Sequence, residues 1–366
     1  YSIGTMNKGT VVINDEGYLM RYLNESSGLP SNLIGFQYED SQKNLWLALD
    51  EGISKVEINS PFTFFDKKTG LKGTVESITR YKETLYAATS DGVYFLETSQ
   101  LNKIKTINTY CNYLLAFDNF LLVATDEGVY QLKEPANPVL LTKESAYVLY
   151  RSKNDSNRIF IGTTNGLSSV QWVEHSSQLK GSWLKTDHYD HIEDEIHSIA
   201  EDHSGNLWIG TADNGVYQFA YDLNYATKTL RHKETQKNYI KESTVIHYDS
   251  ADGLPAGRIY VKEISGKIVF GGETGLYEFI PGDPSPTDGV NSKGSLSFLP
   301  NSNYGIRFAD GTRYIHRISY DHFGNIWFNT HSGKKFEIGF SRYIKENKYL
   351  WDNTQFIRIP QQIYGA

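Results

Sequence analysis

One short pattern recurs along the whole chain, and it constrains the fold more than any other feature. In its full form it has an apolar run, then Gly or Ala and Thr, a short turn with Gly, and then alternating apolar residues, and some copies replace one of these residues. The clearest copy, "LWIGTADNGVYQF", starts at Leu207. A repeat of about 40 to 50 residues with short strands and Gly-containing turns is the signature of propeller blades. The sequence therefore predicts an all-β propeller with four-stranded blades.

Eight copies of this pattern occur. They begin at Ser2, Leu45, Leu85, Leu121, Ile159, Leu207, Ile268 and Ile326. We expect their turn glycines to be structural, because a tight hairpin turn requires a positive φ. These glycines are Gly9, Gly52, Gly92, Gly128, Gly166, Gly215, Gly275 and Gly333. The apolar run before each copy is the expected innermost strand of a blade, the "LWIGT" segment the second strand and the residues after the turn the third. A variable fourth strand, such as residues 62–66, completes the blade.

The two ends of the chain decide the blade count. The first copy starts directly at a second strand, so its inner strand is missing. The last residues, 356–366, carry apolar side chains, and Ile363–Ala366 could pair near Ser2–Thr5. Such pairing would close the ring and remove an exposed edge. We therefore favour one eight-bladed domain over residues 1–366. The alternative is a seven-bladed ring in which residues 1–27 are the tail of an upstream propeller.

Three tryptophans occupy equivalent positions in the second strands: Trp46, Trp208 and Trp327. Because second strands lie inside a sheet that is covered on both faces, we expect these indoles to be structural and largely buried between blades.

Composition excludes several classes of function. The net charge of −7 and the absence of a basic stripe exclude a nucleic-acid partner. The single cysteine, Cys111, allows no internal disulfide, and no apolar run approaches the 18 residues that direct insertion into a membrane requires. The chain opens at Tyr1 without a signal-like segment, so we expect targeting information to lie outside it.

Two stretches resemble a known family closely. They are "EDHSGNLWIGTADNGVYQF" (201–219) and "YDHFGNIWFNTHSG" (320–333), preceded by elements such as "GLPSN" and "GLPAGR". These residues resemble the two-component regulator propeller repeat. A third copy, at 38–53, lacks the turn Gly and has Leu49 in place of Thr, and the other five keep only the hydrophobic-Gly-Thr-Gly skeleton.

This resemblance implies a non-catalytic sensor. Propellers of the family form the extracytoplasmic, periplasmic input part of membrane-anchored histidine kinases or hybrid regulators in Bacteroidota-type bacteria. Many of these are linked to oligosaccharides. The downstream parts of such receptors are absent from these 366 residues, which fits an excised input domain. The implied partners are a small polar ligand, with an oligosaccharide as one candidate, and the receptor domains that would follow in a larger chain.

Two segments invite a metal interpretation. "DHSGN" (202–206) and "DHFGN" (321–325) place oxygen atoms at alternate positions, but they lack the further acidic ligands of a calcium loop, and a hairpin turn explains them fully. The cluster "DHYDHIEDEIH" (187–197) contains three histidines but no HExxH frame, so a solvated loop is the expected structure. We expect no metal and no cofactor.

Catalytic signatures are also lacking. There is no G-x-S-x-G motif, and Cys111 lies beside an inner strand, where a small buried residue is the default. The acid pairs Glu39/Asp40 and Glu201/Asp202 could in principle serve as glycosidase carboxylates. Their repeated position between the first and second strands indicates turn chemistry instead. The sequence predicts that the protein is not an enzyme.

A ligand is expected on the face shared by two kinds of loop, the second-to-third-strand turns and the connections between blades. Acids are frequent in those turns, partly because they favour turns for local reasons. Aromatic rings with polar neighbours suit sugar rings. The candidate ligand-binding residues are Asp50, Glu51, Asp91, Asp126, Glu127, Asp213, Glu273, Tyr189, His191, Arg258 and Tyr314. Trp183 lies nearby in the sequence.

Three functions remain open at this point. The first is a ligand-sensing input domain, the second is a protein-interaction platform, and the third is a propeller enzyme that acts on polysaccharide. Fold alone does not decide among them. The flanking sequence would separate them, because a membrane helix and kinase downstream would identify the sensor.

Overall fold

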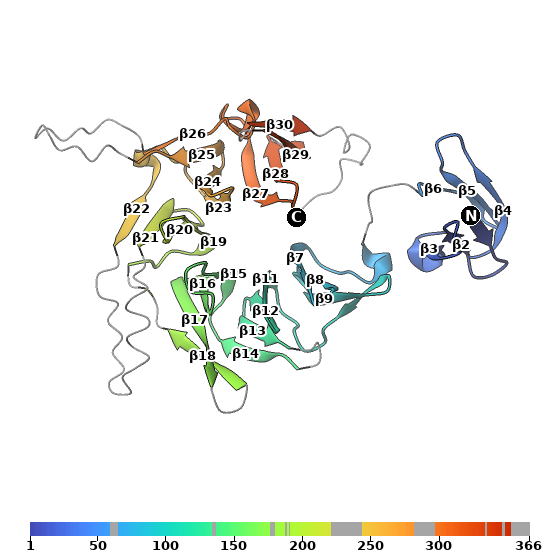
Figure 1. Cartoon of the computed structure of the whole chain (residues 1–366), viewed down its shortest axis with the longest axis horizontal. Coiled ribbons are helices and arrows are strands. Elements are labelled where there is room, and N and C mark those ends of the chain that lie inside the picture. Colours follow the sequence, from blue (N-terminus) through green and yellow to red (C-terminus); the bar gives the residue numbers. More distant parts are fainter. Residues whose placement is uncertain are drawn as a thin grey trace, which may run out of the picture. The chain divides into compact units, whose positions relative to one another are not determined.

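The chain forms eight antiparallel sheets in the part that the computed structural model describes. The described residues are 1–58, 65–133, 137–175, 180–186, 189, 191–220, 244–281, 297–333, 335–345 and 348–352. Within them, six sheets have four strands and two have three strands. This confirms the all-β fold and the eight-sheet count that the repeats predict (Figure 1).

Strands follow one another in sequence order across every sheet. The two three-stranded sheets consist of β1 (Ser2–Gly4), β2 (Thr10–Ile13) and β3 (Leu19–Leu23), and of β4 (Ile34–Glu39), β5 (Leu45–Leu49) and β6 (Gly52–Val56). The next two sheets consist of β7 (Val75–Tyr81), β8 (Thr84–Thr89), β9 (Gly92–Glu97) and β10 (Gln100–Lys103), and of β11 (Cys111–Phe117), β12 (Phe120–Thr125), β13 (Gly128–Leu132) and β14 (Val139–Thr142).

The remaining four sheets repeat the same order. They consist of β15 (Ala146–Arg151), β16 (Arg158–Thr163), β17 (Gly166–His175) and β18 (Lys180–Thr186); of β19 (Ile196–Glu201), β20 (Asn206–Thr211), β21 (Val216–Ala220) and β22 (Val245–Tyr248); of β23 (Tyr260–Ile264), β24 (Lys267–Gly272), β25 (Gly275–Phe279) and β26 (Phe298–Pro300); and of β27 (Tyr314–Tyr320), β28 (Ile326–Ser332), β29 (Lys335–Lys345) and β30 (Lys348–Asp352). Short 3₁₀ turns are η1 (Glu25–Ser27), η2 (Lys67–Thr69), η3 (Ser250–Asp252) and η4 (Ile306–Phe308).

The seven later "LWIGT"-type segments form equivalent strands. They are β5, β8, β12, β16, β20, β24 and β28, and each is the second strand of its sheet. The first copy forms β1, which opens its sheet without a preceding strand, as its sequence predicts. The pattern therefore identifies the position of each strand within its sheet.

Contacts divide the chain into two compact units, Tyr1–Cys111 and Asn112–Ala366. A single domain over 1–366 and closure of the ring therefore stay predictions. The closing segment 356–366, and most of the predicted fourth strand at 62–66, lie outside the described residues. In the second unit the inner strands β15, β19, β23 and β27 contact one another in succession (Figure 1).

The hydrophobic core of the second unit lies between neighbouring sheets. Trp208 on β20 is 3 % exposed, which confirms its predicted burial. Its indole lies against four aromatic rings from β22 and from the next sheet, those of Tyr248, Phe270, Phe279 and Phe298. Burial of this tryptophan therefore depends on the sheet that follows.

The other two tryptophans correct the prediction. Trp46 is 38 % exposed, so the expectation of burial is wrong for it, and Trp327 is only half-buried. Trp46 has the Lys55 ammonium 5.8 Å from its ring centroid, where Trp208 has the aromatic rings of a following sheet. The equivalent strand position thus fixes which way an indole points, while the neighbouring sheet decides whether it is covered.

Candidate functional site

The threonine of the repeat closes the turn between the second and third strands. Thr211 Oγ1 donates to the carbonyl oxygen of Gly215 at 2.9 Å and accepts from the N–H of Asn214 at 2.9 Å. The same pair of bonds forms at Thr89, Thr125 and Thr163. These threonines are at most 1 % exposed, so the turns they close are rigidly attached to the sheets.

The turn glycines have the backbone conformation that was expected of them. All eight have a positive φ, namely Gly9, Gly52, Gly92, Gly128, Gly166, Gly215, Gly275 and Gly333. At Gly166 a Cβ would lie 1.8 Å from the carbonyl oxygen of Ile192, which belongs to the connection into β19. The turn and the connection into the next sheet therefore touch, as expected for loops that share one face.

Several acids of these turns are engaged by their own sheet. Asp91 accepts from the Tyr94 hydroxyl at 2.5 Å and pairs with Lys103 at 3.0 Å, and these contacts lower the pKa of its carboxyl. Asp126 accepts from Asn112 Nδ2 at 3.0 Å. The Tyr130 hydroxyl in turn donates to Glu127 at 3.2 Å. These three predicted ligand residues therefore have local partners already.

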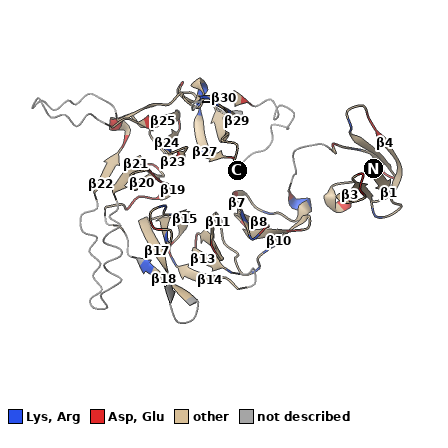
Figure 2. Cartoon of the chain, in the orientation of Figure 1, with Lys and Arg blue, Asp and Glu red and all other residues tan. Residues whose placement is uncertain are grey.

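Four further acids are exposed. Asp50 and Glu51 lie on the β5–β6 turn of the first unit, and Asp213 and Glu273 lie on turns of the second unit. Figure 2 shows that acidic and basic residues are interspersed over the sheets. These acids therefore lie on separate turns that belong to different sheets.

Tyr189 and His191 lie in the connection into β19 but have different environments. Tyr189 is 4 % exposed, packs between Phe160 and Phe219, and shares a 2.9 Å hydrogen bond with Ser169 Oγ. His191 is exposed and has a φ of 71°. The hydrophobic core therefore holds Tyr189, and its ring does not form part of the surface.

The structure adds residues that the sequence reasoning missed. Tyr147 and His197 are each the second residue of an inner strand and His316 is the third, and each lies at a β-bulge, where the pairing register shifts. A bulge adds one residue to one strand and re-aims its side chain. A polar or aromatic residue directly after an apolar one near the start of the inner strand, as in "AYV", "IHS" and "IHR", was the available sequence signal.

These bulged residues belong to two groups of contacts that are linked by the charge of Arg258 acting on His316, and we call the two groups together the rim cluster. Its members are Tyr147, His197, Arg258, Tyr314, His316 and His331. The Tyr147 and His197 ring centroids are 4.4 Å apart, and the Arg258 guanidinium lies 3.5 Å from His197 Nε2. His316 Nε2 and His331 Nδ1 share a 2.7 Å hydrogen bond.

Tyr314 completes the group. Its ring centroid is 4.3 Å from that of His316 and 5.1 Å from that of His331, with which it is stacked. Two predicted ligand residues, Arg258 and Tyr314, thus belong to one cluster with imidazoles that were not predicted. The cluster lies where inner strands begin, beside the turns that end the second strands.

Electrostatics keeps two imidazoles of the rim cluster in the neutral form beside the charged Arg258. Burial and the neighbouring His331 lower the pKa of His316 to about 4. Burial also lowers the pKa of His197, even though its Nε2 shares a 2.6 Å hydrogen bond with Glu195. The charges of Arg258 and Arg317 act in the same direction on both imidazoles. A cation disfavours a second cation nearby, so the two histidines are neutral at pH 7.

The opposite ends of the sheets carry the acid pairs and calcium-like loops of the sequence, and there their role is structural. Asp202 Oδ1 accepts from the N–H groups of Ser204 and Asn206, and its Oδ2 accepts from Asn206 Nδ2 and from the Trp208 indole at 3.0 Å. Asp40 and Asp321 make the same set of bonds in their turns. All four acceptor positions of the turn carboxylate are used.

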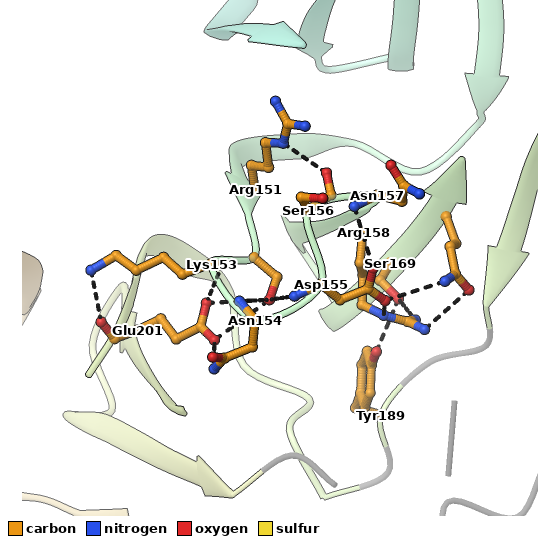
Figure 3. A network of polar contacts seen from close by, with 12 residues as sticks. Arg151, Lys153, Asn154, Asp155, Ser156, Asn157, Arg158, Ser169, Tyr189 and Glu201 are labelled. Carbon is orange, nitrogen blue, oxygen red and sulfur yellow. Dashed lines mark hydrogen bonds and ion pairs between the residues drawn. The ribbon is translucent and has the colours of Figure 1, made fainter. Parts of the chain in front are cut away.

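Glu201 is held in a buried polar network (Figure 3). Its carboxylate accepts from the Lys153 N–H at 2.7 Å, from the Ser152 hydroxyl at 3.3 Å and from the Asn154 amide. These donors lie in the turn between β15 and β16, so Glu201 joins two sheets. Among the described residues, no group of three or more His, Cys, Asp or Glu side chains is placed to hold a metal ion. His188, Asp187 and Asp190 lie outside the described residues.

A comparison with known protein families matches one copy of the repeat. Residues 191–213 match the family model described as "Two component regulator propeller". This stretch of the chain carries the two component regulator propeller repeat. The matched stretch spans β19 and β20 and includes His197 of the rim cluster and Asp213. No helix in the described part of the chain is long and apolar enough to cross a membrane.

Two solved structures are similar to this propeller. One is the extracellular domain of a protein described as a hybrid two component system, BT3049, from B. thetaiotaomicron. It has 19 % sequence identity and a TM-score of 0.60, and the match covers 96 % of this chain and 45 % of that chain. At this identity it supports the propeller fold.

The other is the extracellular domain of BT4673 from the same organism, described as a one component system, with 17 % identity and a TM-score of 0.49. That match covers 85 % of this chain and 38 % of that one. The propeller therefore spans less than half the length of these two domains. The comparison with curated proteins gave no match.

Proposed function

We propose that this propeller is the ligand-sensing, non-catalytic input domain of a bacterial two-component signalling receptor and that it works outside the cytoplasm. The observation that carries the proposal is the regulator propeller repeat at 191–213, which itself contributes His197 to the rim cluster. The similarity of fold to extracellular domains of two component systems agrees with it.

The proposed ligand is an oligosaccharide or another small polar molecule that binds on the face of the rim cluster. Aromatic rings of Tyr147 and Tyr314 offer surfaces on which sugar rings stack, and imidazole and guanidinium groups beside them offer hydrogen bonds. Residues of several sheets meet there, so a ligand would bridge sheets. Signalling requires such a ligand to favour one state of the receptor over another.

A catalytic role is not favoured by the carboxylates. Glu201, Asp202 and their counterparts are occupied by the turns and networks that they stabilise. A glycosidase needs two carboxyl groups that flank a bond of the substrate. In the proposed sensor the ligand is bound and released unchanged.

Calorimetry with a library of polysaccharide fragments, combined with an assay for new reducing ends, tests this proposal. We expect binding of at least one fragment and no release of reducing ends. Steady release of reducing ends that is lost when a carboxylate pair is replaced would identify an enzyme and overturn the proposal.

A further inference from the structure

Arg258 is held firmly in place by its neighbours in the chain. Gly257 forms an isolated parallel bridge with Asn214, and the N–H of Ile259 donates to the carbonyl of Thr211 at 3.2 Å. The Val261 N–H donates to the buried Ser198 hydroxyl at 2.8 Å. The backbone on both sides of Arg258 is therefore fastened to the sheet of β19–β22, and its position is set before any ligand arrives.

The guanidinium at this fixed position is exposed. Among the residues that the structure describes, Arg258 forms no ion pair with a carboxylate, and its nearest polar contact is His197 Nε2 at 3.5 Å. Two carboxylates lie in the neighbourhood. Glu195 is hydrogen-bonded to His197, and Glu273 lies beside Gly257. The positive charge of Arg258 is thus presented to solvent at a site that was assembled from three sheets.

A second cation, Arg317, acts on the same imidazoles as Arg258. Burial lowers the pKa of His316 to about 4, with Arg258 and Arg317 acting in the same direction, and burial lowers the pKa of His197 as well. The positive charges of the arginines attract an anion. An anion bound beside the imidazoles would raise their pKa and so allow them to take up protons. Arginine is the side chain whose planar donor pairs best match a carboxylate or a sulfate.

The geometry points to an acidic ligand: the rim cluster binds a carboxylate or sulfate group of a small polar molecule, with Arg258 as the pairing cation and Tyr147 and Tyr314 as platforms beside it. This inference rests on the proposed function, because it names the chemical class of the ligand at that same face. It makes Arg258, and not the acids of the turns, the charged residue that binds the ligand.

Three simple probes test the inference on the full chain. They are D-glucuronate, sodium sulfate and the neutral sugar D-glucose, each titrated while the imidazole signals of His197 and His316 are followed by NMR. We expect both anions to shift these signals and to raise the pKa of His316, whereas D-glucose at the same concentration leaves it unchanged. A shift with glucuronate but not with sulfate would assign the site to carboxylates, and the reverse to sulfates.

Two variants give the matched controls. Arg258→Gln is expected to weaken anion binding about tenfold or more, because it removes a charge-assisted hydrogen-bonding partner. Arg258→Lys retains the charge and is expected to retain part of the binding. Lys267→Gln removes an exposed cation at the opposite end of the same sheet and should leave binding unchanged. Thermal melting of each variant verifies that it is folded.

The inference is overturned if neither anion shifts His316, if D-glucose shifts it as strongly as D-glucuronate, or if Arg258→Gln binds as tightly as the unaltered chain. Failure of the proposed function is a separate result. A neutral fragment that binds the rim cluster in the library experiment would preserve the sensor and exclude the acidic ligand, while turnover of a fragment would exclude the sensor.

Discussion

The indole N–H of Trp208 donates a hydrogen bond of 3.0 Å to Oδ2 of Asp202, six residues earlier in the chain. The same bond joins Trp46 to Asp40 at 2.9 Å and Trp327 to Asp321 at 3.1 Å. The carboxylate also accepts backbone N–H groups of its own turn. The bond therefore fixes the orientation of the indole from the end of the strand, and the next sheet then packs on the ring.

Replacing Trp208 by Ala should lower the free energy of unfolding by about 3–5 kcal/mol, because it opens a cavity among four aromatic rings. Trp46→Ala is the matched comparison, since it removes the same residue with the same hydrogen bond from an exposed site. We expect it to lower the stability clearly less. Urea denaturation of both variants checks this, and equal losses would contradict the role assigned to the neighbouring sheet.

Removing the carboxylate of Glu201 should also destabilise the protein. Glu201→Ala leaves the N–H of Lys153 and the buried Ser152 hydroxyl without their acceptor, and the loss at a buried group is worth roughly 1–3 kcal/mol. Glu16→Ala, at an exposed acid, should change the stability little. Chemical denaturation measures both, and a loss no larger than that of Glu16→Ala would show that the network in Figure 3 contributes nothing.

Two turn glycines with a similar φ but different surroundings allow the contact between a turn and its neighbouring connection to be tested. Gly166 and Gly52 occupy the same turn position with φ of 112° and 105°. A Cβ on Gly166 would lie 1.8 Å from the Ile192 carbonyl oxygen, whereas nothing lies within 4 Å of a Cβ on Gly52. Gly166→Ala should therefore be the more destabilising, by about 2 kcal/mol or more, in thermal or urea unfolding. Similar losses would contradict the close contact between turn and connection.

Lowering the pH should reduce the free energy of unfolding because His316 takes up a proton in the unfolded state, and this should begin at a higher pH than the titration of most carboxylates. The folded-state pKa of His316 is about 4, below the value of about 6.5 that the unfolded chain has, because of burial and the neighbouring cations. Below pH 6.5 the unfolded state takes up a proton that the folded state refuses. The free energy of unfolding contributed by this group therefore falls as the pH decreases from 6.5 toward 4 and is fully present above 6.5.

Measurement of unfolding at pH 7 and pH 4.5 checks this expectation. His316→Gln should lose less stability between the two values than the unaltered chain. His322→Gln removes an exposed histidine from the turn at the other end of the same sheet and should lose as much as the unaltered chain. An unchanged pH dependence in His316→Gln would be inconsistent with its low pKa.

The sequence was sufficient to predict the sheets, because the signals involved are local. The Thr211–Gly215 turn and the Asp202–Trp208 bond are both contained within a few residues, so the repeat that encodes them is visible in the chain itself. Burial of Trp46 was predicted wrongly because it depends on a neighbouring sheet, which the repeat does not describe.

The candidate site was predicted only in part for the same reason. Arg258 and Tyr314 were named from loop position, whereas the half-buried Tyr147, His197 and His316 are re-aimed by β-bulges that alternation alone does not reveal. Tyr189 was named because it lies in a connecting loop, yet its ring fills the core between two sheets. The position of the loops in the sequence therefore predicted the face on which the rim cluster lies, but not which side chains form the cluster.

The most direct test of the sensor account is hydrogen exchange of the full chain with and without the tightest-binding polysaccharide fragment. Slower amide exchange in the presence of the ligand identifies the backbone segments whose local opening the bound molecule reduces. We predict protection at 195–198, 257–261 and 314–317, where the rim cluster is anchored, and unchanged exchange at the opposite turns, 202–206 and 321–325. Protection of those opposite turns, or no binding of any fragment, would contradict the account.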